Sequence, residues 1–339
     1  MDTTNVPAAV HADATDAAIA WWIVAPGEGE HRPEPLPPRG DGEALVRTLW
    51  TGISRGTESL VARCEVPESE RDRMRAPFQS GDFPFPVKYG YLNVGVVEEG
   101  PDDLVGRTVF SLFPHQSRFV VPADALTVVP DDVPARRAVL AGAVETAVNI
   151  LWDAEPHLGD RVIVVGAGMI GCAVAALAGR IPGVEVTIVD VDPAKADVSA
   201  SLGVGFADPA DELPPADIVI EASGNGAGLQ HALRAAATDG LIVVASWYGS
   251  RPIPLDLGAD FHSRRLTIRS SQVGAVAASR RSRRSTHDRL ALALRLLADP
   301  AFDTLLADSS PWTDLPRLTA DLAEGTAGAL CHTIDWSEA

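Results

Sequence analysis

Residues 162–171 of the chain read VIVVGAGMIG, and this stretch decides the predicted fold. A run of apolar, mostly β-branched residues leads directly into Gly166, Gly168 and Gly171, and a helical pattern follows. In such a turn the first glycine permits a sharp bend, the second lets a pyrophosphate approach the backbone, and the third lets the helix pack on the strand. The helix amino terminus offers its N–H groups to the anion. The stretch therefore predicts a dinucleotide-binding turn in a Rossmann sheet.

An acidic residue, Asp190, closes the next predicted strand, which reads EVTIVD. It stands about 20 residues after the glycines, where a carboxylate accepts hydrogen bonds from the adenosine ribose hydroxyls and repels a 2′-phosphate. No arginine follows it directly to welcome such a phosphate. The sequence therefore predicts NAD(H) as the cofactor. The alternative is a glycine-rich turn that binds nothing.

Alternating strand and helix patterns surround the glycine turn. A long helical stretch over 134–154 precedes it, and apolar runs at 216–224 and 241–249 alternate with helical patterns at 193–203 and 227–240. The apolar runs are continuous, as expected of parallel strands that are covered on both faces. This part of the chain is therefore predicted to be a doubly wound α/β domain.

The flanking parts of the chain have a different pattern. From residue 19 to about 126, short β-like runs are separated by Pro and Gly, which indicates a mostly antiparallel, barrel-like domain. Within it, HRPEPLPPRGDG (31–42) is predicted to be a loop. After the parallel domain, a helix is expected over 286–299, and short strands near 266–269 and 330–335.

Composition excludes several classes of protein. The chain has 339 residues and a net charge of −18, which argues against nucleic acid and anionic membranes as partners. Cys64, Cys172 and Cys331 stand far apart, so neither a disulfide framework nor a four-cysteine zinc site is expected. No run approaches the length of a membrane span, and the amino terminus lacks the features of a secretory signal. A cytoplasmic protein is expected.

The order of a barrel-like domain, a Rossmann domain and a short return resembles the medium-chain dehydrogenase/reductase superfamily, which includes alcohol dehydrogenases. The resemblance also rests on TGISRGTE at 51–58, PVKYGYLNVG at 86–95 and VPADALTVVPDDV at 121–133. Asp190 followed five residues later by Lys195 matches the family's pair around the adenosine ribose.

The resemblance implies an α/β protein with two domains. A GroES-like, mostly β catalytic domain would comprise residues 19–143 and 275–339. A Rossmann domain with a doubly wound parallel sheet would comprise residues 144–274. A disordered tail is expected over residues 1–18, where small and polar residues show no periodicity.

Zinc-dependent members of the superfamily carry T-G-I-C where this chain has Thr51-Gly-Ile-Ser54, and G-H-E where it has Gly90-Tyr91-Leu92. The third ligand falls near Gly142, with Glu145 as the nearest acid. Two hydroxyls and a glycine cannot form a zinc site, because zinc needs thiolate, imidazole or carboxylate ligands. The chain therefore resembles a zinc-lacking branch, loosely similar to hydroxyethyl-bacteriochlorophyllide dehydrogenases, and no zinc is expected.

Without a metal, a side chain must polarise the carbonyl or accept the alcohol proton. By resemblance Ser54 and Tyr91 line the catalytic cleft, and Tyr91 is the better proton donor because a phenol has a pKa of about 10. The alternative is that Tyr91 only fills the vacated metal pocket. His115 lies on a loop that borders the substrate in this superfamily and suits a proton relay, or it is an ordinary surface residue.

Further cofactor contacts are implied by the resemblance. Arg55 stands where relatives reach the pyrophosphate, Ser246 should face the nicotinamide ribose, and the backbone at Gln272 should run beside the carboxamide. The arginines over 280–284 either grip a carboxylate or phosphate on the substrate or form a solvated face. The expected cofactor site comprises Gly166, Gly168, Met169, Ile170, Gly171, Asp190, Lys195, Arg55, Ser246 and Gln272.

The leading interpretation is a zinc-independent oxidoreductase that transfers a hydride between NAD(H) and an alcohol or ketone, with a large or ring-containing substrate left open. Two alternatives remain: an NADPH-dependent enzyme like quinone or enoyl reductases, and a nucleotide-binding redox sensor without turnover. A homodimer is expected because relatives commonly join their nucleotide-domain sheets edge to edge. The stretch 241–255 has the apolar character of such an edge.

Overall fold

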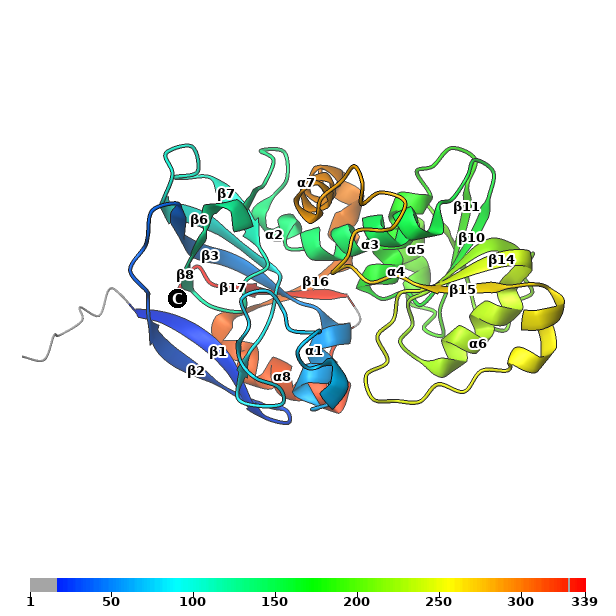
Figure 1. The fold of residues 1–339 in the computed structure, drawn as a ribbon, viewed down its shortest axis with the longest axis horizontal. Helices are drawn as coiled ribbons and strands as arrows, with labels where there is room; N and C mark the ends of the chain where they lie inside the picture. Colours follow the sequence, from blue (N-terminus) through cyan, green and yellow to red (C-terminus); the bar gives the residue numbers. More distant parts are fainter. Residues whose placement is uncertain (1–16, 329) are drawn as a thin grey trace, which may run out of the picture.

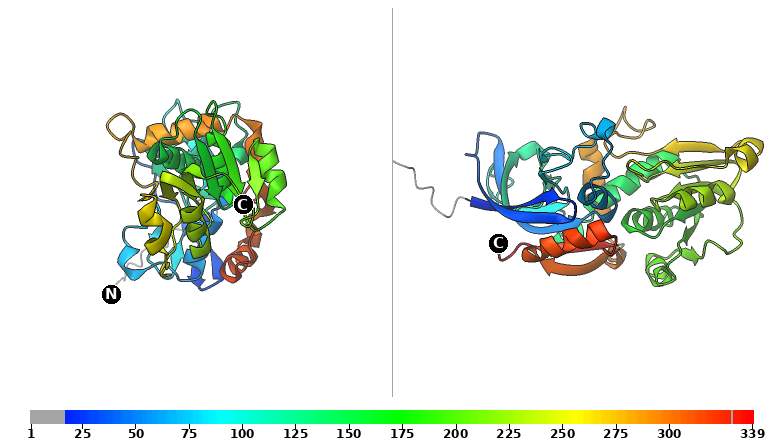
Figure 2. Two further views of the ribbon diagram at one scale, coloured as in Figure 1. Left: turned by 90° about the vertical axis from the view of Figure 1, so that its right-hand side faces the viewer. Right: turned by 90° about the horizontal axis from the view of Figure 1, so that it is seen from below.

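The computed structural model describes residues 17–328 and 330–339, and it has two lobes (Figure 1). One lobe is built from strands, and the other is a parallel sheet covered by helices; the view from below shows the same separation (Figure 2). Of the predicted tail, residues 1–16 lie outside the described residues. Ala17 and Ala18 already belong to strand β1 (Ala17–Ala25), where Ala18 is fully buried, so the predicted tail is two residues too long.

Two sheets form the first lobe. The smaller sheet has the order β2-β1-β5-β4. Besides β1, its strands are β2 (Glu28–Pro35), β4 (Ser80–Gly81) and β5 (Val87–Lys88). The larger has the order β16-β17-β3-β6-β7-β9, with β8 paired to β3. Its strands are β3 (Glu43–Ile53), β6 (Asn93–Glu99), β7 (Thr108–Ser111), β8 (Arg118–Pro122), β9 (Thr127–Val128), β16 (Leu306–Pro311) and β17 (Cys331–Asp335). Apart from β16 and β17, the paired strands run antiparallel, which confirms the predicted GroES-like domain.

The prediction of a loop over 31–42 is wrong at its start. Residues 31–35 continue strand β2, which pairs with β1 as far as Ala17 opposite Pro35. The strand tolerates its prolines because β2 is at the edge of the sheet, where one row of N–H groups needs no partner. Edge position is a tertiary property that composition does not reveal.

The second lobe is a six-stranded parallel sheet in the order β12-β11-β10-β13-β14-β15. Its strands are β10 (Arg161–Val165), β11 (Glu185–Val189), β12 (Gly205–Ala207), β13 (Ala216–Glu221), β14 (Ala236–Val244) and β15 (Thr267–Ser270). Helices α4 (Met169–Ala178), α5 (Lys195–Leu202) and α6 (Gly226–Ala235) lie against it. The strand order reverses between β10 and β13, which is the Rossmann switch point and confirms the predicted domain.

Two predictions about β14 are wrong. The helix ends at Ala235 and the strand begins at Ala236, five residues before its predicted start, because β13 and β14 pair with a shifted register that takes the polar stretch ATDG into the strand. The stretch 241–255 is also not the sheet edge. Strand β14 lies between β13 and β15, and β15 is the edge strand, with mostly exposed residues.

Helices join the two lobes. The predicted helix over 134–154 forms as α2 (Ala135–Ala138) and α3 (Ala141–Ala154), and α3 packs on α4 and on α7 (Thr286–Leu296). One buried cluster therefore continues from Leu92 and Phe110 through α3 to Val164 and Leu290. Helices α1 (Arg55–Ala62) and α8 (Leu315–Glu324) pack together in the first lobe. Among the described residues, no helix is long and apolar enough to cross a membrane.

Candidate active site

A cleft of about 750 Å³ is lined by residues of both lobes. The first lobe contributes the start of α1 and the segment before β6, and the second contributes the glycine turn and the loops that follow β13, β14 and β15. This is the crevice at the carboxyl ends of the strands where open α/β sheets bind ligands. The predicted residues that line it are Ser54, Arg55, Tyr91, Gly168, Met169, Ile170, Ser246 and Gln272.

The glycine turn has no space for side chains at two positions. Gly166 has a φ of 106°, and a Cβ there would lie 2.7 Å from the Cα of Ser223. A Cβ on Gly171 would lie 1.9 Å from the carbonyl oxygen of Gly166. Helix α4 begins at Met169, and its N-cap Gly168 has no side chain to bond the first-turn amides. These N–H groups are therefore left for an anion.

Asp190 lies beside this turn, directly after β11. Its Oδ2 accepts a hydrogen bond from the Ala167 amide at 2.6 Å, and its Oδ1 accepts one from the Asp192 amide at 2.9 Å. A carboxylate has about four lone-pair sites, so sites remain for ribose hydroxyls. Lys195, at the start of α5, has its Nζ 4.0 Å from the carboxylate of Asp192.

Two hydroxyls meet in the cleft. The Tyr91 hydroxyl donates to Ser54 Oγ at 2.7 Å, and the ring of Tyr89 packs edge-on against that of Tyr91. Burial raises the pKa of Tyr91 to about 12, although hydrogen bonds with Ser54 and Thr57 oppose the shift. The phenol is therefore protonated throughout the neutral range, and it acts in the cleft as a hydrogen-bond donor.

His115 is buried behind the cleft and does not line it, unlike the expectation that it borders the substrate. Its Nε2 is 3.1 Å from Glu58 Oε2, and its Nδ1 is 2.7 Å from Thr51 Oγ1. The loop that carries His115 packs against β1 and β3, since the His115 carbonyl accepts from the Trp21 amide. Its environment is therefore set by packing that a loop sequence does not show.

His115 connects two other side chains behind the cleft. With Nε2 protonated, the ring donates to Glu58 Oε2 and its Nδ1 accepts from the Thr51 hydroxyl. Trp336 Nε1 donates to the same Thr51 oxygen at 2.9 Å. The other oxygen of Glu58 accepts the Ser54 amide at 2.7 Å. His115 and Glu58 thus hold the backbone that presents Ser54.

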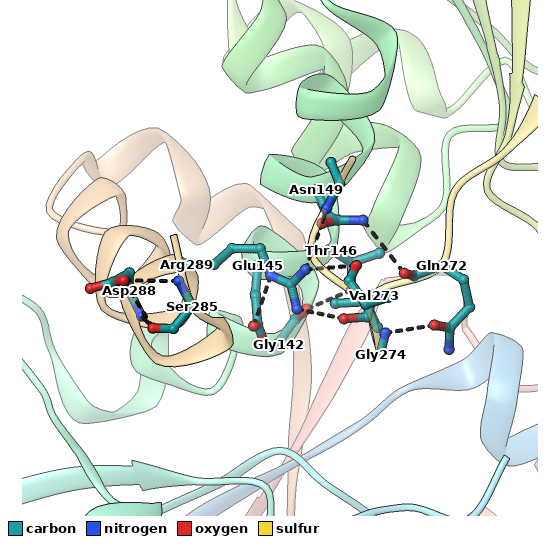
Figure 3. Close-up of polar contacts among 12 residues, drawn as sticks. Gly142, Glu145, Thr146, Asn149, Gln272, Val273, Gly274, Ser285, Asp288 and Arg289 are labelled. Carbon is teal, nitrogen blue, oxygen red and sulfur yellow. Dashed lines mark hydrogen bonds and ion pairs between the residues drawn. The ribbon is translucent and has the colours of Figure 1, made fainter. Parts of the chain in front are cut away.

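Arg289 on α7 is the centre of a buried network on the other side of the cleft (Figure 3). Its Nε donates to Glu145 Oε1 on α3 at 3.0 Å, and its terminal nitrogens donate to Asn149 Oδ1 and to the carbonyls of Val273 and Ala275. Burial raises the pKa of Glu145, and the charge of Arg289 opposes this shift. One side chain therefore ties α3, α7 and the loop after β15 together.

Asn149 holds the same loop from the opposite side. Its Oδ1 accepts the Ala277 amide at 3.0 Å, and its Nδ2 donates to the carbonyl of Gln272 at 3.5 Å. The Gln272 side chain turns back to accept the Gly274 amide at 2.7 Å. The segment that lines the cleft beside the glycine turn is thereby fixed by α3 and α7.

Known proteins share this architecture. No protein-family model matches the chain. It is 27% identical over 251 residues to D-guloside 3-dehydrogenase of Shigella flexneri, covering 65% of this chain and 71% of the relative. A crystal structure of an Escherichia coli alcohol dehydrogenase with NADH has a TM-score of 0.74 at 16% identity and covers 94% of this chain and 99% of that one. A Sinorhizobium meliloti dehydrogenase described as zinc-binding, with NADP bound, has a TM-score of 0.75 at 17% identity and the same coverage.

The sequence match, the two-lobe fold and the glycine turn at the cleft all indicate a similarity to the same group of proteins. In sequence and in fold the chain is similar to alcohol dehydrogenase-like proteins of the medium-chain dehydrogenase/reductase superfamily. A nicotinamide dinucleotide fits the described residues of this cleft, because Gly166 and Gly171 have no room for side chains and the first-turn amides of α4 are uncapped. Gly168, Met169 and Ile170 would lie against it.

A catalytic zinc ion, as in the zinc-dependent branch of the superfamily, does not fit the residues of this cleft. Ser54 and Tyr91 offer hydroxyls, and Glu145 is already paired with Arg289. Within residues 17–328 and 330–339, no group of three His, Cys, Asp or Glu side chains is arranged to hold a metal ion. The Tyr91 and Ser54 hydroxyls in the cleft can instead form hydrogen bonds with a ligand.

The sequence analysis does not identify two buried charged residues, Arg289 in the cleft wall and Glu221 at the end of β13. Arg289 lies on the apolar face of its helix with Ala293, and that helical spacing was the available signal. Glu221, at the end of β13, is fully buried and accepts hydrogen bonds from the Ser223 amide and the Tyr248 hydroxyl. Burial and this hydrogen bond raise the pKa of Tyr248.

The three tyrosines give the first prediction. Burial raises the pKa of Tyr89, Tyr91 and Tyr248, so ultraviolet titration of the native protein should show almost no tyrosinate at about pH 10, whereas the unfolded chain should be about half ionised. The unfolded chain loses its protons first, so stability should fall as the pH rises from about 10 toward 12. A native curve with a tyrosine half ionised near pH 10 would contradict the burial described.

The second prediction concerns Arg289. The Arg289→Met variant leaves Glu145 buried without its partner, which should lower the free energy of unfolding by about 3–5 kcal/mol. Adding Glu145→Gln should restore part of this loss because it removes the unpaired charge. Arg234→Met, on the exposed face of α6, is the control and should change stability by less than about 0.5 kcal/mol. Urea unfolding measures all three, and a wild-type midpoint for Arg289→Met would refute the role of the network.

Proposed function

We propose that this protein is an NAD(H)-dependent dehydrogenase that interconverts a secondary alcohol of a sugar-like substrate and its ketone without a zinc ion. The observation that carries the proposal is the hydrogen-bonded pair Tyr91 and Ser54, which lines the same cleft as the glycine turn. Polar side chains on the cleft wall, among them Thr57, Ser59 and Thr286, suit a substrate rich in hydroxyls. The relative that acts on a D-guloside supports the same substrate class.

Asp190 supports NAD(H) over NADP(H). Its carboxylate is held at the turn by the amides of Ala167 and Asp192, at the place where the adenosine ribose of a dinucleotide lies in Rossmann domains. A 2′-phosphate there would meet a fixed negative charge. When bound, the nicotinamide accepts or supplies the hydride.

The chain's own part in the reaction is to handle charge and a proton on the substrate oxygen. During ketone reduction this oxygen becomes negative. The Tyr91 hydroxyl, whose single proton bonds Ser54 Oγ in the free protein, turns to donate a hydrogen bond and then this proton to the substrate oxygen. The phenolate left behind is stabilised by the hydroxyls of Ser54 and Thr57, and a proton from solvent restores it. Alcohol oxidation follows the same path in reverse.

Buried groups behind the cleft keep this arrangement in place. Glu58 binds the Ser54 amide, and His115 binds Glu58 in turn, so neither needs to touch the substrate. In this proposal His115 is a positioning residue. Arg55 lines the cleft at the amino end of α1, where its charge can meet the cofactor pyrophosphate.

The third prediction tests the proton donor. Tyr91→Phe should lower kcat by about 10²–10³ while the affinity for NADH stays unchanged, because the phenol contacts the substrate oxygen and not the dinucleotide. Ser54→Ala should show a smaller loss. Tyr89→Phe, the matched control, removes a neighbouring phenol and should keep kcat within about threefold. Full turnover by Tyr91→Phe would support a nucleotide-binding protein without this chemistry, and a loss confined to Tyr89→Phe would move the role to Tyr89.

The fourth prediction concerns the choice of cofactor. NADH should bind at least about tenfold more tightly than NADPH, and Asp190→Ser should shrink that ratio because it removes the repelling charge. Asp192→Ser removes a carboxylate two residues away and should leave the ratio unchanged. Fluorescence titration with both nucleotides measures it. Equal or tighter binding of NADPH by the unaltered protein would be incompatible with the proposal.

The fifth prediction concerns assembly. We propose a homodimer in which β15 of one chain pairs with β15 of a second, since β15 is the exposed edge of the parallel sheet. Sedimentation at micromolar concentration should give twice the chain mass of 35.7 kDa. Ile268→Pro, which removes an N–H group on this edge, should shift the protein toward the monomer. A monomeric unaltered protein would rule out this assembly.

A further inference from the structure

A second cavity, of about 380 Å³, lies against α7 and is distinct from the catalytic cleft. Helix α7 contributes a stripe of residues at three- and four-residue spacing, while Arg289 on the same helix turns into the buried network. The cavity is lined by Trp152, Arg280, Arg283, Arg284, Asp288, Ala291, Leu292 and Arg295. We call it the arginine pocket.

The positive charge of the four arginines in this pocket is only partly balanced, by the Asp288 carboxylate, whose charge interacts with that of Arg284. Among residues 17–328 and 330–339, none of their guanidinium groups forms an ion pair, whereas Arg289 and Arg264 nearby in the sequence do. The one acid in the lining, Asp288, already accepts hydrogen bonds from the amide and the hydroxyl of Ser285 at 2.9 Å. A concave cluster of unpaired cations is unexpected on a chain with a net charge of −18.

The backbone that carries these arginines is fixed before any ligand binds. The Arg280 amide donates to the Ala277 carbonyl at 2.8 Å, and the amides of Arg283 and Arg284 donate to the Arg280 carbonyl at 2.8 and 3.0 Å. The Ser279 hydroxyl bonds the Trp152 carbonyl at 2.9 Å, which anchors the turn to the end of α3. A backbone that is already ordered adds no ordering cost when the arginines bind an anion.

The walls of the pocket combine two chemistries. Guanidinium groups bind phosphate oxygens with paired, charge-assisted hydrogen bonds. Trp152 and Leu292, both partly buried, add an apolar surface on which a flat group can lie. The cavity volume falls within the range of about 300–1,000 Å³ that small-molecule sites occupy, which favours a compact ligand over a flat macromolecular surface.

We propose that the arginine pocket binds a small phosphate ester with a planar apolar part, at a site separate from the dinucleotide. The phosphate meets the guanidinium groups of Arg280, Arg283, Arg284 and Arg295, and the planar part lies on Trp152. This assignment does not depend on the proposed dehydrogenase chemistry, because no residue of the pocket belongs to the catalytic cleft.

Calorimetry with AMP, adenosine and inorganic pyrophosphate tests the proposal. Each titration is carried out with the full chain alone and again with the chain saturated with NADH, so that the glycine turn is occupied in the second series. One AMP and one pyrophosphate should bind per chain, more weakly as salt is added, and adenosine should bind at least tenfold more weakly than AMP. Trp152→Leu should weaken AMP and leave pyrophosphate unchanged.

Matched charge variants distinguish specific binding of AMP in the pocket from nonspecific electrostatic attraction of AMP to the protein. Arg280→Gln with Arg284→Gln should weaken AMP at least tenfold. Arg281→Gln with Arg234→Gln makes the same charge change outside the pocket and should weaken it less than twofold. Circular dichroism confirms that both variants are folded. Equal losses in the two pairs, no binding at millimolar AMP, or binding that NADH abolishes would each overturn the proposal.

Discussion

Arg289 carries a positive charge into the contact between the two lobes, and the arrangement of the cleft depends on how that charge is satisfied. A buried guanidinium is tolerable only when its donors are paired. Glu145 and Asn149 on α3, with two carbonyls of the loop after β15, provide the partners. Arg289 lies on α7, and its partners lie on α3 and on the loop after β15. Pairing this one charge therefore holds the two helices and the loop together.

This network also determines what the cleft can do. Glu145 is the acid nearest to the place where zinc-dependent relatives have their third ligand, and its pairing with Arg289 commits it to a structural role. The remaining groups at that place, Tyr91 and Ser54, bond to each other. Burial raises the pKa of the Tyr91 phenol and keeps it protonated, and in the proposed reaction this phenol is the hydrogen-bond donor to the substrate oxygen. His115 and Glu58 stabilise that donor pair from behind.

The sequence predicted the features that depend on local pattern. The spacing of Gly166, Gly168 and Gly171 reports backbone constraints that hold in any such turn, and the parallel sheet around it forms as predicted. Features that depend on distant partners were not predictable. The prolines of β2 are accommodated because that strand is at an edge, and the burial of His115 follows from its packing against β1 and β3. Arg289 is separated from Glu145 by 144 residues, so only helical periodicity pointed to it.

The central claim is that hydroxyl groups of the chain stabilise the substrate oxygen where zinc-dependent relatives use a metal ion. The most direct measurement is a crystal structure with NAD⁺ and a secondary alcohol, grown with added zinc and recorded at the zinc absorption edge. The account predicts no anomalous peak in the cleft and a substrate oxygen within about 3.2 Å of the Tyr91 hydroxyl. A zinc peak in the cleft, coordinated by the substrate oxygen, would contradict it.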